Sequence, residues 1–434
     1  MKAILIYTCF AFTLAGCSTP THDLQSSELT DIIIDWNEKV LTIAEAEDGL
    51  LTLKGLRTIT MMHIAMHDVF QSFCGTYQPY IFAGTTEGAH PTTAIVQAAY
   101  TVAVHQYPDQ QASFQKLLDD ALTKVSDDEA RSAAHSLGEA AADAILQQRE
   151  MDGWNDEAAY QWHPMSPGIY AEFNEHSGTP EGFIFGAGWG AVIPFTLEAN
   201  NQFTSPPPPE IDSQDYTDAF NEVKEAGQFE SNTRTAEQTH FALWWKDFAE
   251  KSHNRLAREL IAEEQLDAID ANRLLARLNM SIFDAYVSSF YNKFQYNHWR
   301  PYTAIRWAAN DENPHTVPDT GWTNTHQHTY AFPSYPSAHG TACSAAMTTL
   351  ADTFGDNYAF TMTTEEVDIA GPFSGKRVMD PATRSFNSFS DAAMECALSR
   401  VYLGIHFRYD SIAGIKLGRQ VGGETLKQLI SSAR

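Results

Sequence analysis

Apolar residues recur at helical spacing through the first third of the chain. The pattern covers Ile32–Ile43, Leu56–Phe70, Thr92–Val104, Ala112–Val125 and Ala130–Arg149. Residues three and four positions apart lie on one face of a helix, so each segment predicts a helix that packs against its neighbours. We therefore expect the first third of the protein to be helical.

The helical pattern is lost between residues 151 and 212, where Gly, Pro, Asn and aromatic residues are frequent and Pro206–Pro209 closes the segment. Its many aromatic side chains are unlike a flexible linker, so we expect an ordered excursion between two helical halves. Helical patterns resume at Tyr216–Ala226, Thr235–Glu250, Asn254–Ala262 and Asp267–Tyr291. Thr235, with Gln238 three residues later, fits a helix N-cap.

The N-terminus has the composition of an export signal, with Lys2, an apolar run over Ala3–Leu14 and the small residues that precede Cys17. It resembles a bacterial lipoprotein signal over residues 1–17, which implies that Cys17 is lipidated and that residues 18–27 form a spacer. The alternative is an ordinary signal peptide with a chance cysteine. We expect export and a lipid anchor at the bacterial cell envelope, on the outer membrane and facing the periplasm or the surface.

The chain is strongly acidic, with a formal net charge of -27 and a sequence pI near 4.8. Nucleic acid and anionic lipid surfaces are therefore poor partners, and membrane contact is expected only through the N-terminal lipid. In so acidic a protein, a local cluster of Lys and Arg requires an explanation.

Three cysteines follow Cys17, namely Cys74, Cys343 and Cys396, and none forms a CxxC pair. Their spacing indicates neither a disulfide framework nor a zinc site. One bridge is possible, although scattered cysteines are more often small buried apolar residues.

The first chemical motif is Lys293-Phe-Gln-Tyr-Asn-His-Trp-Arg300-Pro301. Lys293 and Arg300 are seven residues apart, about two helical turns, so they can share one helix face. Pro301 should end the helix at Arg300. The two cations could bind an oxyanion together, although a solvated helix face gives the same pattern.

The second motif is Pro333-Ser-Tyr-Pro-Ser337-Ala338-His339-Gly340, followed by a stretch of small residues. The stretch predicts a closely packed helix whose first N–H groups, with the Ser337 hydroxyl, would form an anion-binding cup. His339 could act as an acid or base at its edge. A helix cap with a surface histidine is the alternative.

The third motif is Ser399-Arg400-Val-Tyr-Leu-Gly-Ile-His406-Phe-Arg-Tyr-Asp410. On a helix, Asp410 could accept a hydrogen bond from one ring nitrogen of His406 and leave the other free. Arg400 lies off that face, so its length or a distortion near Gly404 must bring it to the site. A buried His–Asp pair without a further role is the alternative.

In this order, the three motifs resemble the signature of the vanadium-dependent haloperoxidase and type-2 phosphatidic acid phosphatase superfamily. Ala338 stands where the family has glycine. Segments His63–Asp68, Ser231–Gln238 and Ala242–Trp245 resemble the haloperoxidase branch. The resemblance implies an all-α fold with two helical bundles, at residues 28–150 and 213–434, separated by the excursion at 151–212. The oxyanion site belongs to the C-terminal bundle.

The resemblance also implies the cofactor and the role of each residue. The cofactor is vanadate, and phosphate can occupy the same site. The equatorial oxygens would be held by Lys293, Arg300, Ser337, the N–H of Ala338, and Arg400. His406 would be the axial vanadium ligand, oriented by Asp410, and His339 would bind the opposite apical oxygen. Lys293 would polarise hydrogen peroxide for attack by a halide, with iodide or bromide favoured and an organic acceptor as a further substrate.

Two other functions use the same residues. In an acid phosphatase, His406 would form a phosphohistidine and His339 would protonate the leaving oxygen. A non-catalytic lipoprotein would bind the oxyanion without turnover. The haloperoxidase-like flanking segments favour oxidation. Halide preference and oligomeric state stay open, as does the role of His298, His326 and His328, whereas His63 and His67 are expected in the interior.

Overall fold

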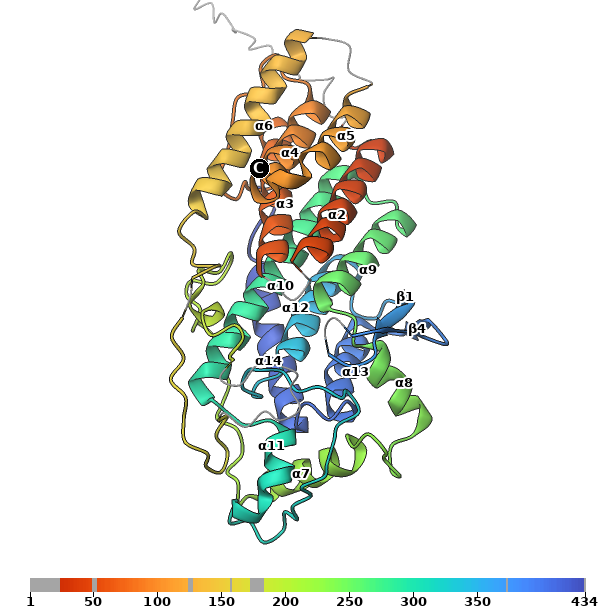
Figure 1. Cartoon of the computed structure of the whole chain (residues 1–434). Helices are drawn as coiled ribbons and strands as arrows, with labels where there is room; N and C mark the ends of the chain where they lie inside the picture. The colour runs from red at the N-terminus through yellow and green to blue at the C-terminus, as the bar shows by residue number, and fades with distance from the viewer. Residues whose placement is uncertain are drawn as a thin grey trace, which may run out of the picture.

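A computed structural model describes residues 24–48, 53–123, 128–156, 158–171, 183–371 and 374–432. The expected export signal, Cys17 and most of the 18–27 spacer lie outside these residues. Helices form most of the described chain, which confirms the all-α fold class (Figure 1). No helix in this part of the chain combines the length and hydropathy needed to cross a bilayer.

The N-terminal helices form one end of the molecule (Figure 1). They are α2 (Ser27–Glu47), α3 (Leu53–Cys74), α4 (Pro91–Gln106), α5 (Gln111–Leu122) and α6 (Asp128–Gln148), with the short 3-10 helix η1 (Pro108–Gln110) before α5. Helix α3 packs against α2, α4 and α6. His63 and His67 are fully buried on it, as expected. The ring nitrogens of His63 lie 3.0 Å from Asn37 and 2.8 Å from Asn272, so this histidine is structural.

The remaining helices form the other half. They are α7 (Gln214–Ala226), α8 (Ala236–Trp244), α9 (Ala249–Glu263), α10 (Ala268–Tyr296), α11 (Pro301–Trp307), α12 (Ala338–Phe354), α13 (Phe389–Tyr402) and α14 (Arg408–Thr425), with η3 (Ala308–Asn310) after α11. Helix α10 packs against α3 of the first group and against α12 and α14 of the second. It is capped at its start by Asp267 and at its end by Asn297, whose φ is 48°. One long helix therefore connects the two groups.

The predicted cap at Thr235 is confirmed. Its hydroxyl accepts from the Gln238 N–H at 3.1 Å, and the Gln238 side chain accepts from the Thr235 N–H at 2.9 Å. The single helix expected over Thr235–Glu250 is wrong, because α8 ends at Trp244 and α9 begins at Ala249. The buried indoles of Trp244 and Trp245 donate to Ala382 and Glu395 respectively, and these contacts anchor the chain where it leaves the helix.

The described end of the excursion, from residue 183 onward, packs along α10. The 3-10 helix η2 (Trp189–Ala191) contacts α10, and the Trp189 ring lies 4.7 Å from that of Phe290. Further on, the backbone N–H groups of Phe195 and Thr196 each donate to the buried Asp284 carboxylate at 2.7 Å. A buried carboxylate is stable only when it is hydrogen-bonded, so Asp284 and this segment stabilise each other.

Two short hairpins lie between α12 and α13, and the hydrophobic pattern does not predict them. Strand β1 (Phe360–Thr363) pairs antiparallel with β4 (Thr383–Phe386), with Phe360 opposite Phe386. Strand β2 (Glu366–Asp368) pairs antiparallel with β3 (Lys376–Val378). Strands of three or four residues are too short to show an alternating pattern clearly.

Close packing of α12 on α14 depends on glycines. A Cβ at Gly414 would lie 2.6 Å from the carbonyl oxygen of Ser337, and one at Gly422 would lie 2.9 Å from that of Ala345. Such distances are too short for carbon and oxygen, so larger residues would separate the helices. The contact brings the start of α12 beside the start of α14, where the second and third motifs meet.

Candidate oxyanion site

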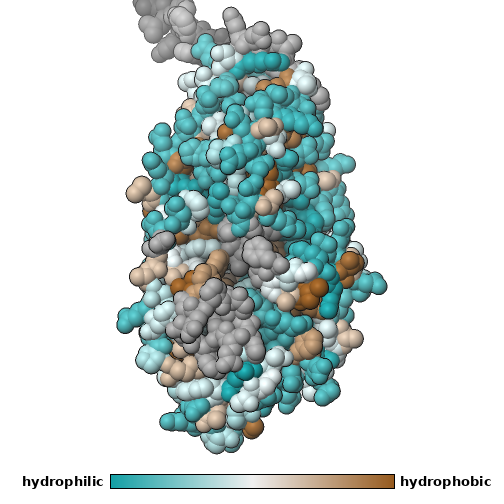
Figure 2. All heavy atoms as spheres, viewed as in Figure 1, coloured by the Kyte–Doolittle hydropathy of each residue, from teal (hydrophilic) through white to brown (hydrophobic). Residues whose placement is uncertain are grey.

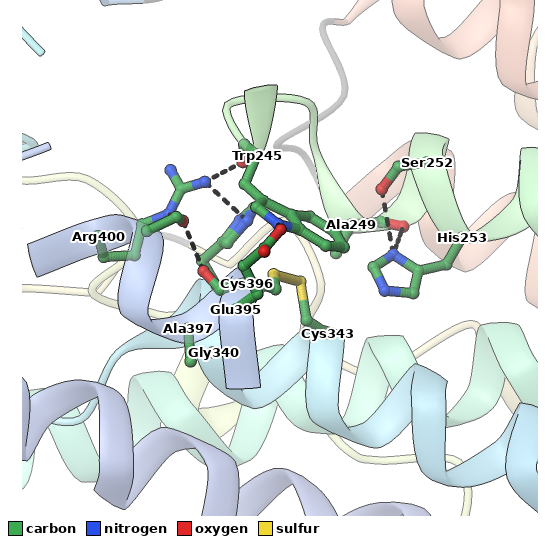
Figure 3. Close-up of a disulfide and its surroundings, with 12 residues drawn as sticks. Trp245, Ala249, Ser252, His253, Gly340, Cys343, Glu395, Cys396, Ala397 and Arg400 are labelled. Atoms are coloured by element: carbon green, nitrogen blue, oxygen red, sulfur yellow. Dashed lines mark hydrogen bonds between the residues drawn. A yellow bond between two sulfur atoms is a disulfide. The ribbon is translucent and has the colours of Figure 1, made fainter. Parts of the chain in front are cut away.

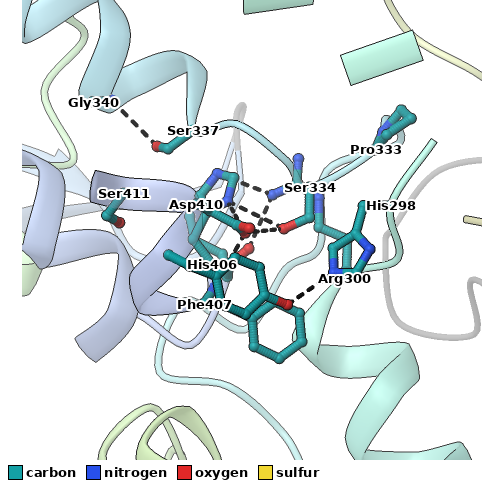
Figure 4. A network of polar contacts seen from close by, with 12 residues as sticks. His298, Arg300, Pro333, Ser334, Ser337, Gly340, His406, Phe407, Asp410 and Ser411 are labelled. Atoms are coloured by element: carbon teal, nitrogen blue, oxygen red, sulfur yellow. Dashed lines mark hydrogen bonds and ion pairs between the residues drawn. The ribbon is translucent and has the colours of Figure 1, made fainter. Parts of the chain in front are cut away.

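His406 lies between two helices and not on one, because α13 ends at Tyr402 and α14 begins at Arg408. The expectation that His406 and Asp410 share a helix is therefore wrong, yet their contact is present. Nδ1 of His406 lies 2.9 Å from Oδ2 of Asp410, which also accepts from the Phe407 N–H at 3.1 Å. Asp410 thus stabilises the start of α14 and orients the imidazole at the same time (Figure 4).

The expected distortion near Gly404 is present, and it brings Arg400 and His406 to one cavity. Gly404 has a φ of 77°, a conformation that residues with a side chain rarely adopt. A Cβ there would also overlap the carbonyl oxygen of Gly227. Past this turn, the Ile405 N–H donates to the Arg400 carbonyl at 3.1 Å. Both Arg400 and His406 line the cavity.

Lys293 and Arg300 do not share a helix face, contrary to expectation. Helix α10 ends at Tyr296, and Arg300 has the extended backbone of the N-cap of α11 (φ -85°, ψ 152°). The two side chains converge through Phe332 instead. The Lys293 ammonium lies 5.2 Å and the Arg300 guanidinium 4.7 Å from the centre of that ring.

Backbone carbonyl groups of residues 332–334, at the start of the second motif and directly before it, hold both cations in place. Nζ of Lys293 donates to the carbonyls of Pro333 and Ser334 at 2.9 and 2.7 Å, and Nε of Arg300 donates to that of Phe332 at 2.9 Å. Neutral carbonyls orient these cations without cancelling their charge, so the positive charge stays available to a ligand.

The contact between Arg300 and His406 defines the imidazole tautomer. Nη1 of Arg300 lies 3.3 Å from Nε2 of His406. A guanidinium can only donate, so Nε2 carries the lone pair and Nδ1 carries the hydrogen that points to Asp410. His406 therefore presents an unprotonated nitrogen on the side of the cations.

The second motif forms the start of α12, as predicted. Ser337 is the N-cap, and its hydroxyl accepts from the Gly340 N–H at 3.2 Å. That hydroxyl can still donate its own proton, and the first N–H groups of a helix have no partner within it. Ala338 is the first helical residue and is absent from the residues with positive φ. Alanine can therefore offer its N–H without strain, while its methyl group narrows the cavity that it lines.

His339 is paired with Arg400 across the cavity. Nη2 of Arg400 lies 2.8 Å from Nε2 of His339 and also donates to the Trp245 carbonyl. Helices α12 and α13, which carry these two residues, are joined by a Cys343–Cys396 disulfide (Figure 3). The sequence left one bridge possible, and the structure forms it, with Cys74 as a free cysteine.

The cavity has polar groups at one part of its wall and mainly aromatic rings elsewhere. It is lined by Lys246, Phe248, Tyr286, Phe290, Tyr330, Phe332, Ala338, His339, Arg400, Ile405 and His406. Such walls exclude water and strengthen electrostatic interactions inside. Lys293, Arg300 and Ser337 are not among the lining residues. Lys293 and Arg300 contact the lining residue Phe332, and Arg300 also contacts His406.

Positive charge is in excess at the site. Lys293, Arg300 and Arg400 are buried, and Asp410 is the carboxylate that contacts His406. Burial lowers the pKa of Lys293, and the charge of Arg300 lowers it further. Burial also lowers the pKa of Arg300 and of Arg400 to about 10. An anion would reverse these shifts, so the site favours anion binding.

Both histidines are neutral at pH 7. Burial lowers the pKa of His406 well below its usual value, and Arg300, Lys293 and Arg400 lower it further. Burial and the charge of Arg400 lower that of His339. Neutral His406 can act as a ligand or a nucleophile, which are the two roles considered from the sequence.

The residues fit a tetrahedral or trigonal oxyanion. Nη2 of Arg300 is buried and has no hydrogen-bond partner among the described residues. A buried guanidinium N–H without a partner is costly, and an oxyanion oxygen would satisfy it. Together with Arg400, the α12 N–H groups and Nε2 of His406, this donor set suits vanadate or phosphate.

Ser334 and Phe332 support the site and were not predicted. The Ser334 hydroxyl donates to Oδ2 of Asp410 and lies 3.2 Å from Nδ1 of His406. Phe332 lies under both cations. Phe332 directly precedes the second motif and Ser334 lies within it, so their proximity to this motif was the signal in the sequence that could have identified them.

The three histidines left open by the sequence do not line the described cavity. His298 is buried and lies 2.8 Å from the Tyr409 hydroxyl. His326 is buried with its ring stacked on Tyr330, and His328 packs edge-on against the same ring.

Sequence comparisons match part of this chain to known proteins. Residues 273–433 match the family model for the second helical-bundle domain of vanadium chloroperoxidase. Vanadium chloroperoxidase of Curvularia inaequalis is 26% identical over 189 residues, which cover 36% of this chain and 30% of that protein. The match thus spans less than a third of the relative's length.

Solved structures extend the likeness to nearly the whole chain. A bacterial vanadium-dependent iodoperoxidase is similar with a TM-score of 0.74 and 22% identity, over 94% of this chain and 98% of that one. A holo-type bacterial vanadium-dependent chloroperoxidase has a TM-score of 0.67 and 16% identity, over 87% and 92%. The fold is therefore that of the vanadium haloperoxidases. The family-model match over residues 273–433 agrees with the resemblance seen in the motifs, and it covers the part of the chain that carries them.

Proposed function

We propose that this protein is a vanadium-dependent haloperoxidase. It oxidises a halide, with iodide or bromide favoured, by using hydrogen peroxide and one proton, and it releases water and a hypohalous acid. The observation that carries the proposal is the pair formed by Arg300 and His406, a buried guanidinium with an unsatisfied N–H beside a neutral imidazole. The likeness to an iodoperoxidase over 94% of the chain supports halide oxidation.

Bound vanadate would supply a Lewis-acidic centre that activates hydrogen peroxide. Nε2 of His406 would be its protein ligand, because Asp410 holds the hydrogen on Nδ1. The oxygens would be bound by Lys293, Arg300, Ser337, the N–H of Ala338, and Arg400. Nε2 of His339 accepts from Arg400, so this neutral imidazole would be placed to take up a proton near those oxygens. The aromatic walls would exclude water from the reacting groups.

The test is halide oxidation by apo-protein prepared without phosphate. Orthovanadate and peroxide are added with iodide or bromide, and a phosphate-ester hydrolysis assay is run beside it. We expect oxidation that depends on vanadate and is lost in His406→Ala, while His135→Ala, an exposed control on α6, behaves as wild type. Hydrolysis that vanadate inhibits, without oxidation, would instead assign the protein to the phosphatases of the superfamily. Tight phosphate binding with neither reaction would indicate a non-catalytic oxyanion-binding protein.

We further propose that the protein is exported and anchored to the cell envelope by a lipid on Cys17. The lipoprotein-like pattern of residues 1–17 supports this proposal. Cys17→Ser should move the protein from the membrane fraction to the aqueous fraction and remove label from radioactive palmitate. Unchanged recovery in membranes would contradict it.

A further inference from the structure

Lys246 is a cation of the cavity wall that belongs to none of the three motifs. It lies in the interruption between α8 and α9, is only 8% exposed, and lines the cavity with His339, Arg400 and His406. A buried lysine loses hydration, so its position needs a compensating interaction.

The β2–β3 hairpin supplies neutral partners only. Nζ of Lys246 donates to the backbone carbonyls of Asp368 and, at 2.9 Å, of Ala370. The Asp368 carboxylate is itself engaged by Lys376 at 2.8 Å. Among the residues that the structure describes, Lys246 forms no ion pair. Its charge is therefore oriented without being neutralised by a counter-ion.

The electrostatic surroundings strengthen this conclusion. The pKa of Lys246 is lowered to about 7, mainly by burial; Asp368 opposes this shift, whereas Arg400, Arg377 and Lys376 contribute to it. An anion bound beside Lys246 would restore its charged form.

The neighbouring wall suits a large, weakly hydrated anion. Lys246 shares the cavity with the rings of Phe248, Tyr286 and Tyr330, which offer polarisable surface and little competition from water. The oxyanion has its own donors in Arg300, Arg400 and the start of α12, so Lys246 is not needed for it. Iodide and bromide are the proposed substrates that match a single cation on an aromatic wall.

We propose that Lys246 and the adjoining aromatic wall form the halide subsite of the cavity. This inference rests on the proposed halide oxidation, because it assigns a binding site in the cavity to the halide substrate of that reaction. Lys246 binds the halide next to the oxyanion cup, and the β2–β3 hairpin holds the ammonium group in position.

The test measures iodide binding separately from turnover. Line broadening of the ¹²⁷I resonance is followed in vanadate-loaded protein without peroxide, for wild type, Lys246→Met and Lys246→Arg. Loss of the charge should weaken iodide binding at least about tenfold, whereas arginine should keep it within about threefold. Lys251→Met is the matched control, since Lys251 is a more exposed lysine that pairs with Glu45. Vanadate affinity should change less than threefold in all variants.

Steady-state kinetics provide the second readout. Lys246→Met should raise the KM for iodide while the KM for peroxide stays near the wild-type value. Unchanged iodide binding in Lys246→Met would overturn the proposal. An equal loss of vanadate and iodide affinity would also overturn it, because it would place Lys246 among the residues that bind the oxyanion. If Lys246→Met unfolds, as judged by circular dichroism, Lys246→Gln takes its place. Absence of turnover in wild type would refute the proposed function, while the binding series would still decide where the anion lies.

Discussion

His406 and Asp410 are four residues apart and in contact, yet only Asp410 lies on a helix. The carboxylate, in the first turn of α14, reaches back to hold Nδ1 of His406 at 2.9 Å. This geometry couples the start of the helix to the orientation of the imidazole.

Asp410→Asn should weaken vanadate binding about 10- to 100-fold, because the amide no longer requires the hydrogen to stay on Nδ1. Equilibrium dialysis with vanadate would measure this change. Asp352→Asn, at a half-exposed partner of Arg277, is the control. If Asp410→Asn bound vanadate with wild-type affinity, Asp410 would not be needed to orient His406.

Ala338→Gly should change oxyanion affinity less than about threefold, since the N–H of Ala338 is already in helical geometry. The same change should lower the free energy of unfolding by roughly 1 kcal/mol, because glycine loses more backbone entropy on folding. Phosphate titration and urea unfolding would check the two effects. A large gain in affinity would show that the methyl group obstructs the site.

The Cys343–Cys396 bridge closes a sequence separation of 53 residues. Replacing both cysteines by alanine should lower the free energy of unfolding by about 4 kcal/mol, since the unfolded chain gains conformational entropy. Urea unfolding would measure the loss, with Cys74→Ala as the control. Thiol titration of the unreduced, denatured mature protein should leave Cys343 and Cys396 unreactive, and reaction of either one would contradict the bridge.

Glu250 is fully buried, and burial raises its pKa to about 8, although the Tyr286 hydroxyl donates to it at 2.9 Å. The folded state therefore keeps a proton that the unfolded state releases above its ordinary pKa of about 4.5, so this group destabilises the fold as pH rises from 4.5 to 8. The free energy of unfolding of Glu250→Gln minus that of wild type should rise by about 1.4 kcal/mol per pH unit between pH 6 and 7.5. Denaturant unfolding of both proteins at several pH values tests this, because the contributions of the other titrating groups cancel in the difference. A flat difference would show that the carboxyl is charged throughout.

The site residues could be predicted because their chemistry lies in short segments, whereas their geometry could not. Lys293 and Arg300 have helical spacing, but Asn297 adopts a left-handed conformation and ends the helix between them. His406 and Asp410 have the spacing of one helical turn, but the turn at Gly404 places His406 outside α14. Spacing alone does not show where a helix ends when buried contacts decide it.

Other features depend on contacts distant in sequence. The Cys343–Cys396 bridge requires α12 to lie beside α13, which the cysteine spacing does not indicate. Lys246 reaches the cavity because α8 ends early and a hairpin more than 100 residues later accepts its hydrogen bonds. The helical pattern predicted the helices of the first third well, because burial of their apolar faces determines it locally, but it did not show the break between α8 and α9.

Helix α10 limits where the chain could be cut to give a folded fragment. The family match to the second bundle begins at residue 273, inside a helix that starts at Ala268 and packs against α3 of the N-terminal group. A fragment cut at that boundary would expose the apolar side of α10 and would lose Asn254, whose side chain is hydrogen-bonded to that of Asn279 on α10. Lys293 lies near the C-terminal end of the same helix. Unfolding of the cut N-terminal end of α10 would therefore extend toward the anion site. Transplanting the chemistry to another scaffold would therefore require both halves.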